Sequence, residues 1–309
     1  MMGEVFNQAS EEYTPGIFSL LNRKSVDGAV RNVTGKTGLG KLGRFDDGDD
    51  LPSRRRYKTY TTRIEVNNYG AFIDVTKNSI VDRDEQFRAD LDEMRDLTIA
   101  ANYSMDQAGV QLFNGGFATS VDVNGYRMTW YGDGKPLFST IHPTVVPGGS
   151  TQSNASSTGI LFTHDNLETA RVALVLQQTD DGLALTMTGK PMLVLPENLQ
   201  KEGLEITASQ LKPDTANNAI NVFSNGMGVD MTTSALFDSV NGGSNTAWFL
   251  CVPGRHKLNH EERQALTLEQ DTNIKNKVVT FTVDARWANS VTDWRRTWGS
   301  KGDGAAYSS

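Results

Sequence analysis

The stretch DRDEQFRADLDEMRDLTIAANYSMDQAGVQLFNGG fills residues 82–116 and contains the clearest pattern in this chain. Along it, apolar or small side chains recur at alternating spacings of four and three, which places them on one face of an α-helix. They are Phe87, Leu91, Met94, Thr98, Ala101, Met105, Ala108 and Leu112. Asp82 or Asp84 can cap the start of this helix, and Asn114-Gly115-Gly116 can end it.

The pattern therefore predicts a single long helix over residues 83–113. At about 1.5 Å per residue such a helix is roughly 45 Å long, whereas the mean helix in globular proteins has only about 11–12 residues. The small side chains of Ala101 and Ala108 favour close packing on a sheet. A coiled coil is the alternative, but the sequence offers only one such segment.

The residues on either side of the long helix predict a chain with both strands and helices. Residues 57–80 contain β-branched and aromatic side chains in strand-like alternation. Residues 121–146 resemble β-structure, and the low-complexity loop 147–159 is the best candidate boundary. Beyond it we expect a helix over 165–178, buried strands over 192–195, 220–223 and 247–252, a helix opened by Pro196, and a late strand over 279–283. The first 27 residues predict an extended arm, with a short helix near 17–22.

Composition and charge narrow the class of protein. The chain has 309 residues, of which 38% are hydrophobic and 22% charged, and these values favour a soluble globular protein. No apolar run approaches the ~20 residues that span a bilayer, and no secretory signal is evident. Cys251 is the only cysteine, so an internal disulfide is excluded and a buried thiol in a reducing compartment is expected. A net charge of −7 disfavours tight DNA binding, but is compatible with a surface that faces DNA without gripping it.

A glycine-rich, charged stretch precedes the first predicted strand. Residues 28–56 contain few large apolar side chains, and an acidic block lies only a few residues from a basic one. One interpretation is a solvated loop. The other is a loop whose charges find partners on neighbouring subunits, and its candidate contact residues are Asp46, Asp47, Asp49, Asp50, Arg54, Arg55, Arg56 and Lys58.

Apparent chemical motifs each fail at an identifiable position. Residues 35–42 match a phosphate-binding loop up to its lysine, but Leu42 stands where a hydroxyl should bind magnesium. His256 and His260 have metal-ligand spacing, yet no third ligand is suggested, and an exposed polar turn is the expectation. The aspartates around Gly48 lack the alternating ligands of a calcium loop. No serine-hydrolase elbow is present. We therefore expect no catalytic, cofactor-binding or metal-binding residues.

The order of the parts resembles the tailed-bacteriophage major capsid fold, named for phage Hong Kong ninety-seven. Phe72-Ile73-Asp74-Val75-Thr76-Lys77, continued to Asp84, is similar to the family's strand that runs into its spine helix, and Leu112-Phe113-Asn114-Gly115 is similar to the helix exit. Two stretches are closer to Mu-like head subunits, Gly132 to Pro143 and Leu167 to Leu199, and the terminal Asp293 to Arg296 also fits. The resemblance covers nearly the whole chain.

The resemblance implies an α+β fold divided along the chain. The expected parts are an N-terminal arm (1–27), an extended β-hairpin loop (28–70), a peripheral domain with the spine helix (71–160), an α/β axial domain (161–265), and a C-terminal return strand and tail (266–309). The implied function is a non-enzymatic major capsid protein that self-assembles into hexamers and pentamers of an icosahedral shell around double-stranded DNA. A tail or decoration protein, or a hydrolase using His256 or His260, are the alternatives.

The resemblance also implies partners. They are other copies of this chain, a portal and a decoration protein, with assembly in the bacterial cytoplasm and final residence in the virion. An arm of about 27 residues is too short for the built-in scaffolding region of some family members, so we expect a separate scaffolding protein. Lys36, Lys41 and Lys58 are available for the covalent crosslink of other members, but no partner asparagine or activating carboxylate can be named. No crosslink is therefore expected.

Overall fold

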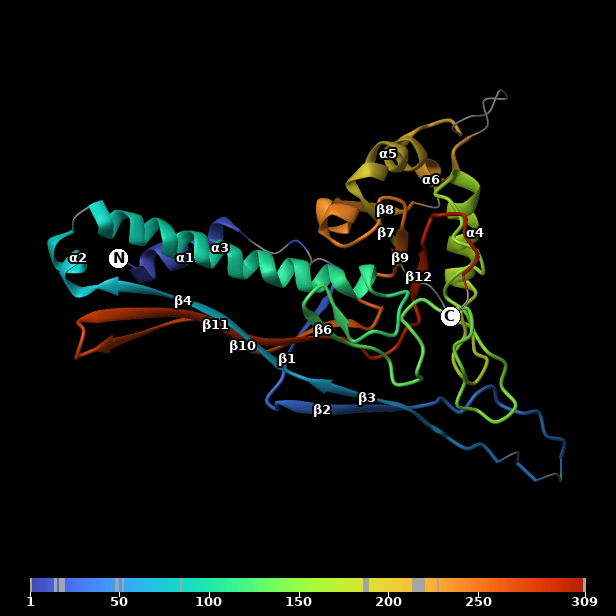
Figure 1. Cartoon of the computed structure of the whole chain (residues 1–309). Helices are drawn as coiled ribbons and strands as arrows, with labels where there is room; N and C mark the ends of the chain where they lie inside the picture. The colour runs from blue at the N-terminus through green and yellow to red at the C-terminus, as the bar shows by residue number, and fades with distance from the viewer. Residues whose placement is uncertain are drawn as a thin grey trace. The chain divides into compact units, whose positions relative to one another are not determined.

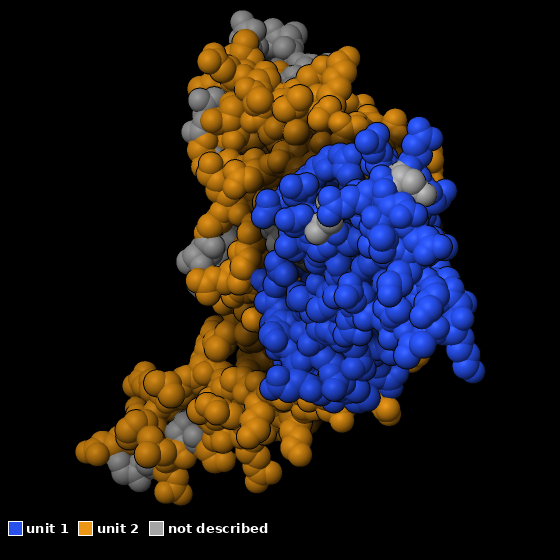
Figure 2. All heavy atoms as spheres, turned by 90° about the vertical axis from the view of Figure 1, so that its left-hand side faces the viewer, with its two compact units in different colours: residues 1–31, 64–110, 259–289 blue, residues 32–63, 111–258, 290–309 orange. Residues whose placement is uncertain are grey.

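The computed structural model describes residues 2–13, 16, 20–47, 50–51, 53–83, 85–185, 189–212, 220–226 and 228–307 (Figure 1). The chain divides into two compact units, each built from three separate stretches (Figure 2). Unit 1 comprises residues 1–31, 64–110 and 259–289, and unit 2 comprises residues 32–63, 111–258 and 290–309. Both units combine helices and strands, so the expected α+β class is confirmed.

The predicted long helix is present as α3 (Glu85–Asn114), within two residues of the expected bounds at each end. A short helix, α2 (Lys77–Asp82), precedes it, and the Thr76 hydroxyl caps α2 by accepting a hydrogen bond from the Ser79 amide. Arg83 ends α2 in a left-handed conformation with φ of 51°. Within the described residues, no helix is both long enough and apolar enough to cross a membrane.

The sheet of unit 1 forms around β11 (Val278–Val291), which lies between β4 (Asn67–Thr76) and β10 (Leu258–Asn273). β4 pairs with β11 in antiparallel register, and β1 (Asn22–Ser25) adds to β10 in parallel. Alternate side chains of β11 are buried, as the period of a strand with one covered face requires. Phe87 and Met94 of α3 pack against that face, which contributes Ile73, Val75, Val279, Phe281 and Val283 to the core.

The N-terminal segment differs from the expectation. A helix forms at α1 (Met2–Glu12). Of the helix expected near 17–22, residues 20–22 are not helical, since residue 22 begins β1 (Asn22–Ser25), and residues 17–19 lie outside the described residues. Met2, Val5 and Phe6 join the core of unit 1. A bidentate ion pair of Glu12 with Arg95 then fixes the end of the helix on α3.

Unit 2 contains a four-stranded sheet with the order β12-β9-β7-β8. Its strands are β7 (Met192–Pro196), β8 (Asp230–Ser234), β9 (Trp248–Cys251) and β12 (Thr297–Ser300). β7 runs parallel to β8 and antiparallel to β9. Its middle residues are fully buried, which explains the continuous apolar runs that predicted strands at 192–195 and 247–252.

Helices complete unit 2. They are α4 (His164–Val175), α5 (Gln200–Ala208), and α6 (Val222–Asn225), and the 3₁₀ turn Glu197–Leu199 after Pro196 leads into α5. The expected strand over 220–223 is wrong, because Val222 starts α6 and Ile220 is mostly exposed. Asn221 caps α6 instead, accepting a hydrogen bond from the Phe223 amide. A small hairpin of β5 (Asp122–Val123) and β6 (Tyr126–Thr129) follows α3.

Candidate interaction surface and buried polar network

Two strands that lie mostly in unit 2 flank the charged loop. β2 (Val30–Lys36) and β3 (Lys58–Glu65) form a two-stranded sheet, and residues 37–57 between them contain no helix or strand where they are described. Glycines permit close approach here: a Cβ on Gly35 would lie 2.8 Å from the Thr59 hydroxyl, and one on Gly38 2.9 Å from Asp181 Oδ2. Two glycines of the stretch that mimics a phosphate-binding loop, Gly35 and Gly38, therefore leave room for the side chains of Thr59 and Asp181.

The sequence-predicted contact residues lie on this loop and are exposed. Within the described part of the chain Asp46 pairs with Arg44, at 3.2 Å, and both side chains are largely in solvent. Among the described residues, Asp47, Asp50 and the three arginines 54–56 form no ion pair with one another. Lys58 is the exposed first residue of β3, and Asp49 lies outside the described residues. We call Asp46, Asp47 and Asp50 the acidic segment.

A hollow of about 560 Å³ opens beside this loop. Lys41, Arg54 and Arg55 line it together with one carboxylate among its described lining residues, that of Asp181. Tyr57 and Val146 also line the hollow. We call this site the basic hollow, since three cations face one anion in it. Asp181 Oδ2 is buried and has no hydrogen-bond partner among the described residues.

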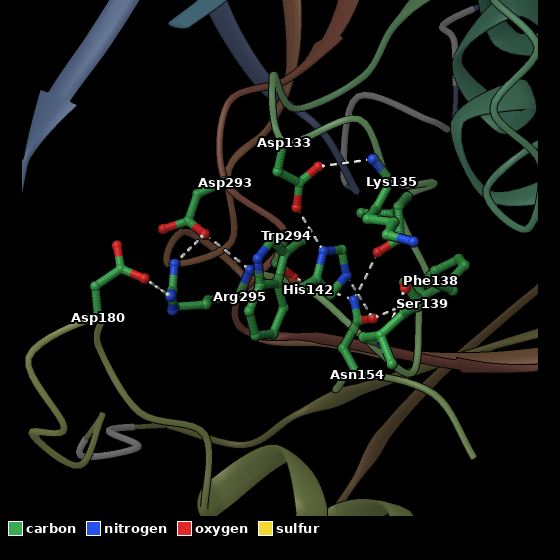
Figure 3. A network of polar contacts seen from close by, with 12 residues as sticks. Asp133, Lys135, Phe138, Ser139, His142, Asn154, Asp180, Asp293, Trp294 and Arg295 are labelled. Carbon is green, nitrogen blue, oxygen red and sulfur yellow. Dashed lines mark hydrogen bonds and ion pairs between the residues drawn. The ribbon is translucent and has the colours of Figure 1, made fainter. Parts of the chain in front are cut away.

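A second feature of unit 2 is a buried polar network (Figure 3). Its centre is Asn154, which is fully buried and whose Oδ1 accepts the Ser139 amide at 2.9 Å. The Asn154 amide nitrogen donates to the Leu137 carbonyl at 2.8 Å, and this bond fixes the orientation of the side chain. His142 lies between Asn154 and Asp133, with Nε2 at 3.1 Å from Asn154 Oδ1 and Nδ1 at 2.7 Å from Asp133 Oδ2.

The C-terminal stretch supplies the other half of the network. The Trp294 ring stacks on His142 with centroids 4.2 Å apart, and the Arg295 guanidinium lies 4.6 Å from the Trp294 centroid. Arg295 pairs with Asp180 at 2.7 Å and with Asp293 at 3.2 Å. Burial lowers the pKa of Arg295, but Asp293 and Asp180 raise it more, so the guanidinium stays charged in the interior.

This network is suited to holding distant segments together rather than to catalysis. An Asp–His pair resembles part of a hydrolytic triad, but here the second ring nitrogen faces the Asn154 amide oxygen instead of a nucleophilic hydroxyl or thiol. His142 and Asp133 are also almost completely shielded from solvent. No group of three metal-ligating side chains occurs in the part of the chain that the structure describes.

His256 and His260 are buried and not on an exposed turn, so that expectation is wrong. His256 accepts the Leu258 amide through Nδ1, and His260 Nδ1 lies 2.8 Å from Asn289 Oδ1 at the start of β10. Burial lowers the pKa of His260, which keeps the imidazole neutral. Cys251 is buried in β9 as expected, and burial raises the pKa of its thiol to about 12.

Sequence reasoning missed how these residues converge. Asp133 and His142 fall within one of the quoted stretches and Asp293 to Arg296 within another, but nothing in their spacing indicates contact across about 150 positions. Asn154 sits in the low-complexity stretch 147–159, which the sequence marks only as a loop. The pairing of β12 with β9 brings Trp294 and Arg295 back to this region.

Comparison with known proteins assigns a family to this chain. A family model described as phage capsid protein matches residues 59–298, which is well over half of the chain. Among proteins of curated function, none matches this chain.

Solved structures share the fold at low sequence identity. The structure from Mycobacterium phage Patience is 11% identical with a TM-score of 0.58, covering 98% of this chain and 89% of that one. The capsid of Cyanophage P-SCSP1u is 10% identical with a TM-score of 0.56, covering 93% and 88%. The mature capsid of bacteriophage PhiM1 is 9% identical with a TM-score of 0.55, covering 93% and 86%. With the family match over residues 59–298, the architecture built on α3 leads to one conclusion: this chain belongs to the phage capsid protein family.

Proposed function

We propose that this chain is the major capsid protein of a tailed phage and assembles into hexamers and pentamers of a closed icosahedral shell around double-stranded DNA. The observation that carries the proposal is the family match over residues 59–298. The chain acts as building material in this proposal and not as an enzyme. The buried Asp133–His142 pair, whose second ring nitrogen faces the Asn154 amide oxygen and not a nucleophile among the described residues, supports that view.

Assembly follows from contacts between unlike surfaces. Such heterologous contacts generate rings when the rotation between neighbours closes. We propose that the loop between β2 and β3 lies over a neighbouring subunit, adding backbone hydrogen bonds as an extra strand. Charges of residues 46–50, 54–56 and 58 contribute ion pairs there. Each exposed pair is worth only about 0–1 kcal/mol, but symmetric repetition makes many weak contacts act together.

We propose the division expected from sequence as the functional layout of the subunit: arm 1–27, extended loop 28–70, peripheral domain 71–160, axial domain 161–265 and return segment 266–309. α3 supplies the spine of the peripheral part. The four-stranded sheet with α4 and α5 supplies the axial part. We also propose a similarity in pattern to Mu-like head subunits, on the stretches 132–143 and 167–199, with 293–296 fitting as well.

Further partners belong to the same proposal. A separate scaffolding protein, a portal and a decoration protein are expected to join the shell, which assembles in the bacterial cytoplasm before release as virions. With a net charge of −7, the inner surface faces packaged DNA without sequence-specific binding. No covalent crosslink is proposed, and denaturing electrophoresis of intact particles tests this, because a ladder of multimers would contradict it.

Electron microscopy of the purified full-length chain tests the main proposal. Closed shells, or rings of six and five subunits, are the expected result. The competing assignments give other results: a tail protein forms tubes or open rings, and a decoration protein remains a small oligomer that binds preformed shells. A monodisperse small oligomer with catalytic turnover would favour a hydrolase and contradict the capsid assignment.

A further inference from the structure

We propose that the basic hollow receives the acidic segment of a second copy of this chain. Lys41, Arg54 and Arg55 of one subunit then face Asp46, Asp47 and Asp50 of the next. The inference rests on the proposed function and deepens it: it names the two contacting surfaces, their charge and their direction.

The receiving surface is incomplete within one chain. Lys41, Arg54 and Arg55 bring three positive charges to a hollow of about 560 Å³, and among its described lining residues Asp181 is the one carboxylate. Among the described residues none of these three cations forms an ion pair. Clustered cations repel one another, and a complementary anionic partner removes that repulsion. The hollow therefore fits an occupant that carries several carboxylates.

The acidic segment supplies such an occupant but does not reach the hollow of its own chain. Asp46 contacts Arg44, which stands outside the lining, and Asp46, Asp47 and Asp50 are all absent from the described lining residues. All three carboxylates are exposed. The two charge blocks are thus held apart on one loop although a few residues separate them in sequence.

Apolar side chains beside the acidic segment are also exposed to solvent in the single chain. Leu42 is 97% exposed, Leu51 72% and Phe45 54%. Apolar side chains exposed to this extent next to a charged segment are typical of an interaction site. A protein partner that covers them excludes water and strengthens the ion pairs beside them. This observation favours another protein chain over a small anion as the occupant.

The direction of the contact has a consequence for ring size. An acidic segment in one subunit and a basic hollow in the next make a head-to-tail contact, which closes into rings. Suppose that one variant has a net positive charge at both surfaces and another a net negative charge at both. Neither variant pairs with itself, and together they pair only in alternation. Alternating rings must contain an even number of subunits, so hexamers form and pentamers do not.

The test uses two full-length variants. The first is Asp46→Lys/Asp47→Lys/Asp50→Lys, and the second is Lys41→Glu/Arg54→Glu/Arg55→Glu. Each changes only exposed side chains, and circular dichroism confirms the fold. Sedimentation velocity and electron microscopy then follow each variant alone, their equimolar mixture, and a chain that carries all six changes. The matched control is Lys41→Arg/Arg54→Lys/Arg55→Lys, which keeps the charge.

Each variant alone is expected to associate about 100-fold or more weakly than the wild type, because like charges then face each other. The mixture is expected to give hexamers without pentamers or closed shells. The six-change chain, in which both charges are exchanged, and the control are expected to regain closed shells. Closed shells from either variant alone, or pentamers from the mixture, would overturn the inference. If the wild type forms no closed shells, the proposed function is contradicted and not this contact. If the wild type then forms open assemblies and the two variants do not, the contact is still supported.

Discussion

Unit 2 uses the same residue types, aspartate and arginine, in two opposite ways. In the buried network Arg295 and Asp180 lie 2.7 Å apart with side chains less than 10% exposed, and every charge has its partner within the chain. On the loop of residues 37–57, arginines and aspartates are exposed and mostly unpaired among the described residues. Paired charges hold one subunit together, whereas unpaired charges remain available to another subunit.

Among the substitutions considered, Arg295→Ala in the buried network should lower the free energy of unfolding most. Asp180 and Asp293 would remain close together without their cation, and removal of one partner of a buried pair costs about 3–5 kcal/mol. Urea unfolding of the unassembled subunit, followed by tryptophan fluorescence, measures the loss. A loss below about 1 kcal/mol would mean that the pair contributes no more than exposed charges do.

Asn154→Ala tests whether the network depends on its centre. The Ser139 amide would lose its acceptor and the Leu137 carbonyl its donor, in a site without access to solvent. Each buried polar group left unpaired costs about 1–3 kcal/mol, so a loss of about 2–3 kcal/mol is expected. Asn166→Ala is the matched control, because the Asn166 side chain also donates to a carbonyl but is exposed. Equal losses in the two variants would contradict the prediction.

A smaller effect is expected from pH at His260. Burial lowers the pKa of this histidine, so below its ordinary value of 6.5 the unfolded chain binds the proton that the folded chain resists. The free energy of unfolding should therefore fall as pH decreases from about 7 to 5. Asn289, Glu262 and Arg23 face the ring and remain in place in His260→Gln. That variant should show a shallower fall over the same range, and an unchanged slope would exclude His260 as the cause.

The smallest effect on the subunit itself is expected at Arg54, on the exposed side of the comparison. Arg54→Ala should change the free energy of unfolding of the unassembled chain by no more than about 0.5 kcal/mol. Arg54 has no ion-pair partner among the described residues, so water can fill the place of its side chain with little change in the free energy of unfolding. The same substitution should weaken association, which sedimentation measures. A large loss of subunit stability would show that the arginine serves its own chain.

The sequence predicts those parts of the fold that repeat locally. The spacing from Phe87 to Leu112 follows one helix face, and α3 lies within two residues of the prediction. The alternation of Val279, Phe281 and Val283 likewise marks the buried face of β11. α1 was missed although Met2, Val5, Phe6 and Ala9 have helical spacing. Its apolar face finds a partner only in the core beneath α3, and a segment of this length gains little from local propensity alone.

The buried network could not be predicted in the same way. His142 depends on Trp294 and Asp133, and Asn154 on the Leu137 carbonyl, so each contact joins segments that no local pattern relates. His260 was expected on a turn because polar residues surround it, but β10 begins there and buries it against Asn289. The charged loop of residues 37–57 was easier to predict from sequence, because its acidic and basic residues are neighbours along the chain. Its contacts with a neighbour remain a prediction.

The interleaving of the two units also constrains how the protein is made. Unit 1 takes its third segment from residues 259–289, and β1 can pair with β10 only when Asn259 reaches Asn22. At about 5–20 residues per second, a ribosome supplies that partner strand only after residues 26–258 have been added. Such distant pairings also slow folding itself. Unit 1 therefore stays incomplete in any nascent chain that has not yet reached residues 259–289, and no subunit can enter a growing particle before then.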